Sequence, residues 1–165
     1  EGLYCGQRQT FVRLAGCNLA CGYCDTASAR VEKPDQCRVE ESPGSGRFAE
    51  TPNPMSVDVV VTACRRMGSE VVALTGGEPL TQPDFLAAVM RGLQTCGLNT
   101  YLETNGTLYK ELLSVIQYAG VIAMDIKLPS ASGIDGLWEA HALFLDVASC
   151  SDVFVKTVVS HETTT

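Results

Sequence analysis

Five apolar runs alternate along this chain with segments of helical pattern, and this alternation limits the fold more than any other feature. The predicted strands are residues 10–16, 70–79, 99–106, 121–128 and 152–160. The predicted helices between them are residues 56–68, 82–97, about 108–119 and about 136–149. Strands separated by helices of this length imply right-handed crossovers and a parallel sheet covered by helices. The sequence therefore predicts an α/β fold.

Local signals support these boundaries. Ser56 can cap the helix 56–68, Asp58 lies in its first turn, and Gly68 follows its end. The runs "EVVALT" and "GVIAM" are typical of strands buried on both faces, and "TFVRLAG" is predicted to be a buried first strand. Residues 27–54 are rich in Pro, Gly, Ser and charge, so we predict a surface connection or insertion there.

Composition restricts the class of protein. The chain has 165 residues, of which 45% are hydrophobic, so we expect a single domain over 1–165 with its own core. A formal charge of −7 argues against binding to nucleic acid, because that affinity comes from Lys and Arg. No apolar run approaches the roughly 18 residues of a membrane span. We therefore expect a soluble protein, with no membrane or nucleic-acid partner. Eight cysteines in a chain of this size, without a recognisable signal peptide, favour a reducing cytoplasm over a disulfide framework.

Polar clusters follow four of the predicted strands at the point where each strand ends. They are "CNLACGYCDT" (17–26), "TGGEP" (75–79), "ETNG" (103–106) and "DIK" (125–127). Because the carboxyl ends of parallel strands meet at one edge of a sheet, we expect one site there.

Cys17, Cys21 and Cys24 form the spacing C-x3-C-x2-C. Structural thiols and a zinc site are the simpler interpretations, but structural zinc needs four ligands, usually in two pairs. The remaining cysteines and both histidines are scattered and more typical of structural or surface residues: Cys5, Cys37, Cys64, Cys96, Cys150, His141 and His161. Cys64 and Cys96 fall in helical patterns, where a free thiol is usually a small buried group. Three thiolates without a fourth fit a four-iron cluster with one iron left open for a small molecule.

These motifs resemble the radical S-adenosylmethionine (SAM) superfamily. C-x3-C-x2-C with Tyr23 before the last cysteine, then "TGGEP", "ETNG" and "DIK", occur in that superfamily's order. Within it, "FVRLAGCNLACGYCDT", "LTGGEPL", "ETNGT" and "DIKLPS" are most similar to the 7-carboxy-7-deazaguanine synthase family. The resemblance covers essentially the whole chain. It implies a partial (β/α)6 barrel of the radical SAM type, from which the final helix and strand are expected to be missing.

The resemblance also implies roles for individual residues. It assigns Cys17, Cys21 and Cys24 to a [4Fe-4S] cluster and Thr26 to Mg²⁺. It assigns substrate contacts to Glu1, Arg13 and Thr75; the glutamine and glycine that precede this glutamate in the family's Q-G-E-G segment are absent. It assigns cofactor contacts to Tyr23, Asp25, Gly76, Gly77, Glu78, Glu103, Asn105, Asp125 and Lys127. Arg13 can instead be an ion-pair partner, Thr26 or Asp25 can cap the turn, and Glu103 and Asp125 can simply be polar strand ends.

The implied reaction is that of a radical SAM lyase, a carbon–nitrogen lyase. It converts 6-carboxy-5,6,7,8-tetrahydropterin into 7-carboxy-7-deazaguanine and ammonia in deazapurine (queuosine-type) biosynthesis, with no catalytic residue beyond the cluster-bound cofactor. The expected partners are the pterin, an electron donor such as flavodoxin or ferredoxin, and a second copy of the chain in a homodimer. Two alternatives are an activase of glycyl-radical enzymes, where His-Asn typically follows the third cysteine in place of "DT", and a non-catalytic iron–sulfur electron carrier.

Overall fold

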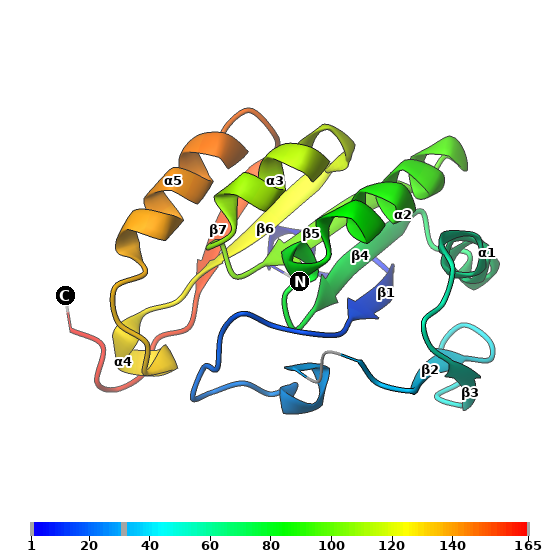
Figure 1. The fold of residues 1–165 in the computed structure, drawn as a ribbon, viewed down its shortest axis with the longest axis horizontal. Coiled ribbons are helices and arrows are strands. Elements are labelled where there is room, and N and C mark those ends of the chain that lie inside the picture. The colour runs from blue at the N-terminus through cyan, green and yellow to red at the C-terminus, as the bar shows by residue number, and fades with distance from the viewer. Residues whose placement is uncertain (1, 31–32, 165) are drawn as a thin grey trace.

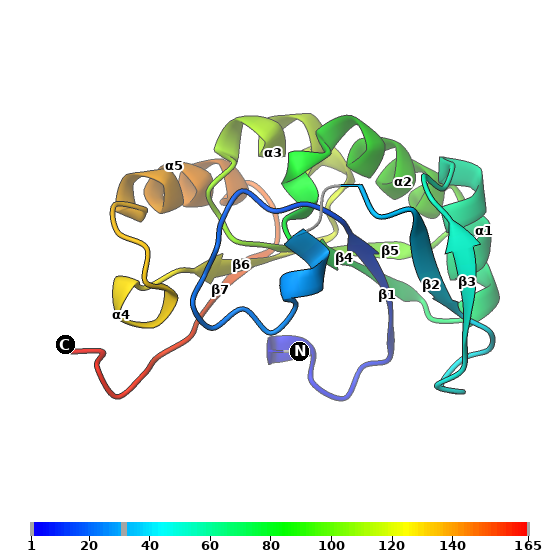
Figure 2. The same ribbon diagram turned by 60° about the horizontal axis from the view of Figure 1, so that its bottom comes forward.

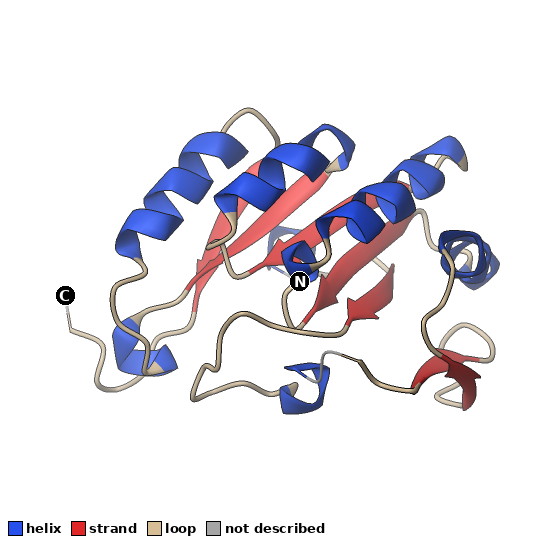
Figure 3. Ribbon diagram, in the orientation of Figure 1, coloured by secondary structure: helices blue, strands red, loops and turns tan. Residues whose placement is uncertain are grey.

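The computed structural model describes residues 2–30 and 33–164, and its centre is a parallel sheet. The strand order is β1-β4-β5-β6-β7, as Figures 1 and 3 show. The strands are β1 (Gln9–Leu14), β4 (Val71–Gly76), β5 (Asn99–Thr104), β6 (Val121–Ile126) and β7 (Val153–Thr157). The predicted α/β fold with five parallel strands is confirmed. Within the described residues the sheet is open, with β1 and β7 at its edges, so the architecture is a partial barrel.

Helices cover one face of this sheet (Figure 2). They are α1 (Val57–Met67), α2 (Pro83–Thr95), α3 (Tyr109–Val115) and α5 (Trp138–Ala148), with a short α4 (Pro129–Ser132) after β6. The main core lies between helices and sheet, and Leu74, Leu102 and Met124 are fully buried in it. No helix in the described residues is both long and apolar enough for a membrane span.

The predicted ends of α1 are confirmed in atomic detail. The Ser56 hydroxyl accepts a hydrogen bond from the Val59 amide, and Gly68 ends the helix in the left-handed conformation with φ of 68°. A residue without a Cβ adopts that conformation at least cost, which explains the glycine at this position.

Two predictions about the fold are wrong. Strand β1 is not a buried strand, because it lies at the edge of the sheet and, among the described residues, pairs only with β4; Phe11 is 54% exposed. The segment 27–54, predicted to be a surface connection or insertion, also contains an antiparallel hairpin that was not predicted, β2 (Gln36–Glu40) and β3 (Phe48–Pro52). Cys96 is exposed because it follows the last turn of α2, whereas Cys64 is buried as predicted.

On the face of the sheet opposite the helices, aromatic side chains lie near the start of the strands and charged side chains lie near their carboxyl ends. Tyr101 of β5 meets Tyr4 with ring centroids 5.5 Å apart, and Phe154 of β7 lies 6.2 Å from Tyr101. Further along the same strands, this face carries Glu103 and Lys156. The alternation of side chains along each strand thus places apolar residues at the start of the strands and charged residues near their carboxyl ends.

Candidate active site

The segment 17–26, here called the cysteine loop, follows β1 and extends past the carboxyl ends of the central strands (Figures 1 and 2). Two backbone hydrogen bonds attach it to the rest of the protein, one just before its first residue and one in its middle. The Glu78 amide donates to the Gly16 carbonyl at 2.8 Å, and the Gly22 amide donates to the Ser132 carbonyl, also at 2.8 Å. The loop is therefore attached both to the end of β4 and to the segment after β6, as the sequence predicted for a site shared by several strand ends.

The three thiols of the cysteine loop are free and partly buried. Burial raises the pKa of Cys17 above its usual value, and the charges of Glu78, Cys21 and Cys24 raise it further. Burial likewise raises the pKa of Cys21, against the opposing charge of Lys127. Three thiolates at this place repel one another, so holding all three ionised requires positive charge between them.

This donor set fits an iron–sulfur cluster. Among the described residues, no three His, Cys, Asp or Glu side chains meet at a point where one metal ion could sit. A cubane cluster has a different requirement, because each thiolate binds a different iron. Cys17, Cys21 and Cys24 would hold three irons, and the fourth iron would stay open.

Two glycines at the end of β4 make close contacts, Gly76 with the end of β1 and Gly77 with the start of the cysteine loop. A Cβ on Gly77 would lie 2.8 Å from the Cβ of Cys17, and a Cβ on Gly76 would lie 2.9 Å from the Leu14 nitrogen. Both distances are too short for real atoms. These glycines therefore let the end of β4 approach β1 and Cys17, a role beside the predicted approach to a bound methionine group.

Glu78 is fully buried behind this loop, and donors of the chain occupy both carboxylate oxygens. Oε1 accepts from the Leu80 amide and from the Thr104 hydroxyl, both at 3.0 Å, and Oε2 accepts from the Asn105 amide at 2.7 Å. Glu78 thus connects the end of β4 to the end of β5. The predicted contact of Glu78 with the ammonium group of SAM would be a fourth interaction of this carboxylate, beside these three hydrogen bonds.

We expect Glu78 to make the stability of the metal-free protein depend on pH. Burial raises its pKa from 4.5 to about 7, although the three hydrogen bonds oppose the shift. Between these values the folded chain keeps a proton that the unfolded chain releases, so stability falls as pH rises from 4.5 to 7, by ~3 kcal/mol, and then levels off. Urea unfolding from pH 5 to 8 should show this fall in the parent relative to Glu78→Gln. A difference between the two proteins that stays constant over this range would contradict it.

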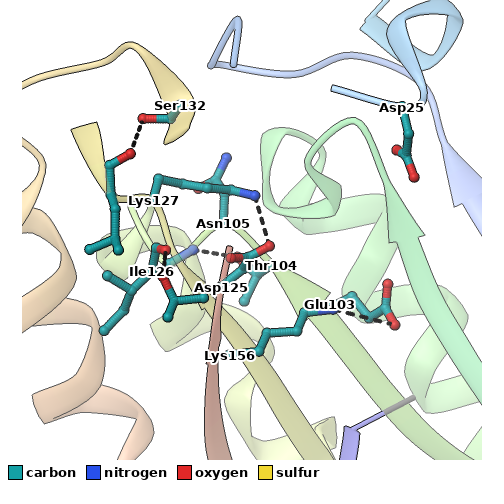
Figure 4. Close-up of polar contacts among 12 residues, drawn as sticks. Asp25, Glu103, Thr104, Asn105, Asp125, Ile126, Lys127, Ser132 and Lys156 are labelled. Atoms are coloured by element: carbon teal, nitrogen blue, oxygen red, sulfur yellow. Dashed lines mark hydrogen bonds and ion pairs between the residues drawn. The ribbon is translucent and has the colours of Figure 1, made fainter. Parts of the chain in front are cut away.

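Charged residues from the three neighbouring strands β5, β6 and β7 gather on the face of the sheet opposite the helices (Figure 4). Lys127 donates to Asp125 Oδ2 at 2.8 Å, and its ammonium lies 5.0 Å from the ring centroid of Tyr23. Burial opposes the charge on Lys127, but Asp125 and Tyr23 outweigh it and raise its pKa above the usual value. Lys156 points towards Glu103, with Nζ 3.9 Å from Oε1. The structure thus brings Tyr23 and the "DIK" residues together.

The predicted substrate and magnesium residues lie at the β1 side of the site. Arg13 and Thr75 are partners in the β1–β4 register, and the Arg13 guanidinium donates to the Gly76 carbonyl at 3.1 Å. The Thr26 hydroxyl donates to the exposed Asp25 carboxylate at 2.6 Å. Figure 4 shows Asp25 on a separate segment from the residues at the ends of β5 and β6. Glu1 lies outside the described residues.

A groove of about 1390 Å³ runs along the outer edge of β1. Arg13, Cys17 and Asn18 line it together with residues of the β2–β3 hairpin and of α1. The charged residues at the ends of β5 and β6 do not line this groove. It therefore reaches the cysteine loop from the side of the hairpin.

Sequence reasoning missed four residues of this site. Asn18 and Thr107 bond to each other at 2.9 Å between the cysteine loop and the end of β5. His141 of α5, expected to be a surface or packing residue, is buried, and its Nε2 lies 3.1 Å from the Asn105 carbonyl. Alternate side chains of β7 lie on the face of the sheet opposite the helices, and Lys156 is one of them. This alternation could have identified Lys156 as a site residue from the sequence.

Comparison with known proteins agrees with this site. The model of the radical SAM superfamily matches residues 11–134, which include the cysteine loop and the polar ends of β4, β5 and β6. Fold comparison gives a TM-score of 0.50 with the crystal structure of QueE from Escherichia coli, at 18% identity, over 95% of this chain and 88% of that one. This likeness supports the fold. The chain belongs to the radical SAM superfamily.

Relatives of higher identity narrow the assignment. The chain is 42% identical to a 7-carboxy-7-deazaguanine synthase of Geobacter sulfurreducens over 99% of its own length, and 34% identical to one of Thermococcus kodakarensis over the same share. It spans 66% and 68% of the length of these two relatives. Within the superfamily, the chain belongs to the 7-carboxy-7-deazaguanine synthase family. The family implies a [4Fe-4S] cluster and SAM as cofactors.

Proposed function

We propose that this protein is a radical SAM lyase that converts 6-carboxy-5,6,7,8-tetrahydropterin into 7-carboxy-7-deazaguanine and ammonia. The observation that carries the proposal is the sequence "CNLACGYCDT" on a loop that joins the strand ends, in a chain 42% identical to a 7-carboxy-7-deazaguanine synthase. When bound, the cluster and SAM supply a carbon-centred radical that removes a hydrogen atom from the substrate and later returns it. The chain binds and orients the reactants.

Arg13 is the proposed partner of the substrate carboxylate. Its bond to the Gly76 carbonyl uses one of the five N–H donors of the guanidinium and holds the side chain beside Thr75. A guanidinium can pair with a carboxylate through two parallel hydrogen bonds, which lysine cannot reproduce. The hydroxyl of Thr75, next to Arg13 in the register, is the proposed hydrogen-bonding partner of the pterin ring.

Thr26 is the proposed magnesium ligand. Magnesium prefers oxygen ligands and keeps several waters, so a hydroxyl and a substrate carboxylate form a reasonable part of its shell. The Thr26 hydroxyl lies 2.6 Å from the exposed carboxylate of Asp25, which adds negative charge close to this position. The family resemblance also leads us to propose that a small electron donor such as flavodoxin or ferredoxin reduces the cluster, and that the protein works as a homodimer in the cytoplasm.

The decisive experiment follows products by mass. Protein with its cluster rebuilt under anoxic conditions is incubated with dithionite, SAM, magnesium and the carboxy-tetrahydropterin. Formation of the deazaguanine carboxylate without net consumption of SAM supports the proposal. Accumulation of 5′-deoxyadenosine alone would leave the superfamily assignment and refute the substrate, and an electron carrier would form neither product.

Thr26→Ala should weaken the response to magnesium. Loss of one oxygen ligand worth ~1.4 kcal/mol raises the magnesium concentration for half-maximal turnover about tenfold. Thr26→Ser is the matched control, because it keeps the hydroxyl and should respond like the parent. Equal magnesium titrations for Thr26→Ala and the parent would exclude Thr26 as a ligand.

A further inference from the structure

Asn18, directly after the first cluster cysteine, uses both ends of its side-chain amide to bond the end of β5. Its Oδ1 accepts from Asn105 Nδ2 at 2.8 Å, and its Nδ2 donates to Thr107 Oγ1 at 2.9 Å. These partners are 87 and 89 residues away in the sequence. The contact therefore joins two of the motifs that the fold brings to this edge of the sheet.

The three side chains form a closed ring of hydrogen bonds. The Thr107 hydroxyl donates to Asn105 Oδ1 at 2.6 Å, Asn105 donates to Asn18, and Asn18 donates back to the Thr107 hydroxyl. Each side chain in the ring gives one hydrogen bond and receives one, so each bond polarises the next. Turning the Asn18 amide alone by 180° would place donor against donor, and turning the Asn105 amide alone would place acceptor against acceptor. The Thr107 backbone amide also donates to Asn105 Oδ1 at 3.2 Å, which fixes the Asn105 amide and, through the ring, the Asn18 amide.

Asn105 is held firmly enough to act as the anchor of this ring. The residue is only 6% exposed, and its backbone amide donates to the buried Glu78 carboxylate at 2.7 Å. His141 Nε2 lies 3.1 Å from its backbone carbonyl, and since a carbonyl only accepts, that nitrogen carries the proton. The anchor is thus attached to both the end of β4 and helix α5.

The ring and a second attachment hold opposite halves of the cysteine loop. Asn18 attaches the half that begins at Cys17, and the Gly22 amide attaches the other half through its bond to Ser132. Gly77 packs against the Cys17 side chain from the direction of β4. Cys17 therefore lies between a tight backbone contact at its Cβ and the Asn18 ring, and its Sγ accepts from the Leu19 amide at 3.5 Å.

We propose that Asn18 is a positioning residue for the iron–sulfur cluster, acting through Asn105 and Thr107 to set the place of Cys17 and of the iron that binds SAM. The proposal also gives the Asn105 side chain a positioning role in place of the predicted contact with the nucleotide or the methionine group. It rests on the cluster of the proposed function, and it does not depend on the identity of the substrate.

The test uses reconstituted protein, three single variants and one double variant, Asn18→Ala with Thr107→Val. Asn18→Ala removes the member of the ring that belongs to the cysteine loop. Thr107→Val removes the hydroxyl with little change in shape, while Thr107→Ser keeps the hydroxyl. Electron paramagnetic resonance of the reduced cluster, recorded through a SAM titration, reports the affinity for SAM and the environment of the cluster. Iron content and the melting temperature are measured on the same samples.

Asn18→Ala and Thr107→Val should each lower SAM affinity about tenfold and broaden the spectrum of the reduced cluster, because each opens the ring beside Cys17. Iron content should stay nearly unchanged, and the melting temperature should fall by only a few degrees. Thr107→Ser should match the parent. The double variant should be no worse than either single one, since both break the same ring. Three results would overturn the proposal. They are spectra and SAM affinity in Asn18→Ala that match the parent, losses of SAM affinity that add up in the double variant, and losses of SAM affinity that follow the fall in melting temperature from variant to variant. A parent protein that forms no product but binds SAM normally would refute only the substrate.

Discussion

Gly77→Ala is expected to prevent assembly of the cluster. The new methyl group would lie 2.8 Å from the Cβ of Cys17 and would overlap the Gly16 backbone. The Glu78 amide bonds Gly16 at 2.8 Å, and the Gly77 amide bonds Leu14 at 3.1 Å, so the two segments cannot separate without breaking these bonds. Overpacking of this kind costs ~1–3 kcal/mol or more, and here the strain falls on a cluster cysteine. We expect iron and sulfide content after anaerobic reconstitution to fall to background.

Gly22→Ala is the matched control for this variant. Gly22 also belongs to the cysteine loop, but a Cβ there would meet only backbone oxygens of the α4 segment, the nearest at 3.5 Å, which is an ordinary contact. Iron content in Gly22→Ala should therefore stay close to that of the parent. Equal iron content in Gly77→Ala and Gly22→Ala would show that the close packing of Gly77 does not matter for the cluster.

Cys21→Ala is the second variant with a very large expected effect. A cluster held by three thiolates loses one of its three protein bonds, and the remaining two iron–thiolate bonds leave a second iron exposed to solvent. Turnover and the visible absorption of the cluster should both disappear. Cys96→Ala is the control, because that free thiol is exposed at the end of α2, away from the cysteine loop. Turnover that survives in Cys21→Ala would exclude the cluster as the source of the activity.

The sequence was sufficient to predict the sheet because each strand carries its own signal. The run 71–75 is buried throughout, as its continuous apolar character indicated, and Gly68 ends the preceding helix as predicted. The hairpin 36–52 could not be predicted, because β2 has only two apolar residues, Cys37 and Val39, and β3 carries no apolar alternation. The exposure of β1 was missed for another reason: an apolar run does not reveal whether its strand lies at the centre or the edge of a sheet.

In the candidate site, too, features with a local sequence signal could be predicted, and features that depend on distant contacts could not. Motifs that are continuous in the sequence, such as residues 17–26 and 75–79, could be placed at strand ends without a structure. The ring of Asn18, Asn105 and Thr107 could not, because it depends on contacts between residues nearly ninety positions apart. Glu78 shows the limit most clearly: its motif was recognised, but its complete burial and its bond to the Asn105 amide follow only from packing.

The central claim is that Cys17, Cys21 and Cys24 hold three irons of a cluster whose fourth iron binds SAM. The most direct measurement is Mössbauer spectroscopy of protein reconstituted with ⁵⁷Fe under anoxic conditions, before and after addition of SAM. The predicted result is about four iron and four sulfide per chain, with the signal of a single iron site shifting when SAM binds. Zinc in place of iron and sulfide, or a spectrum that SAM leaves unchanged, would contradict the claim.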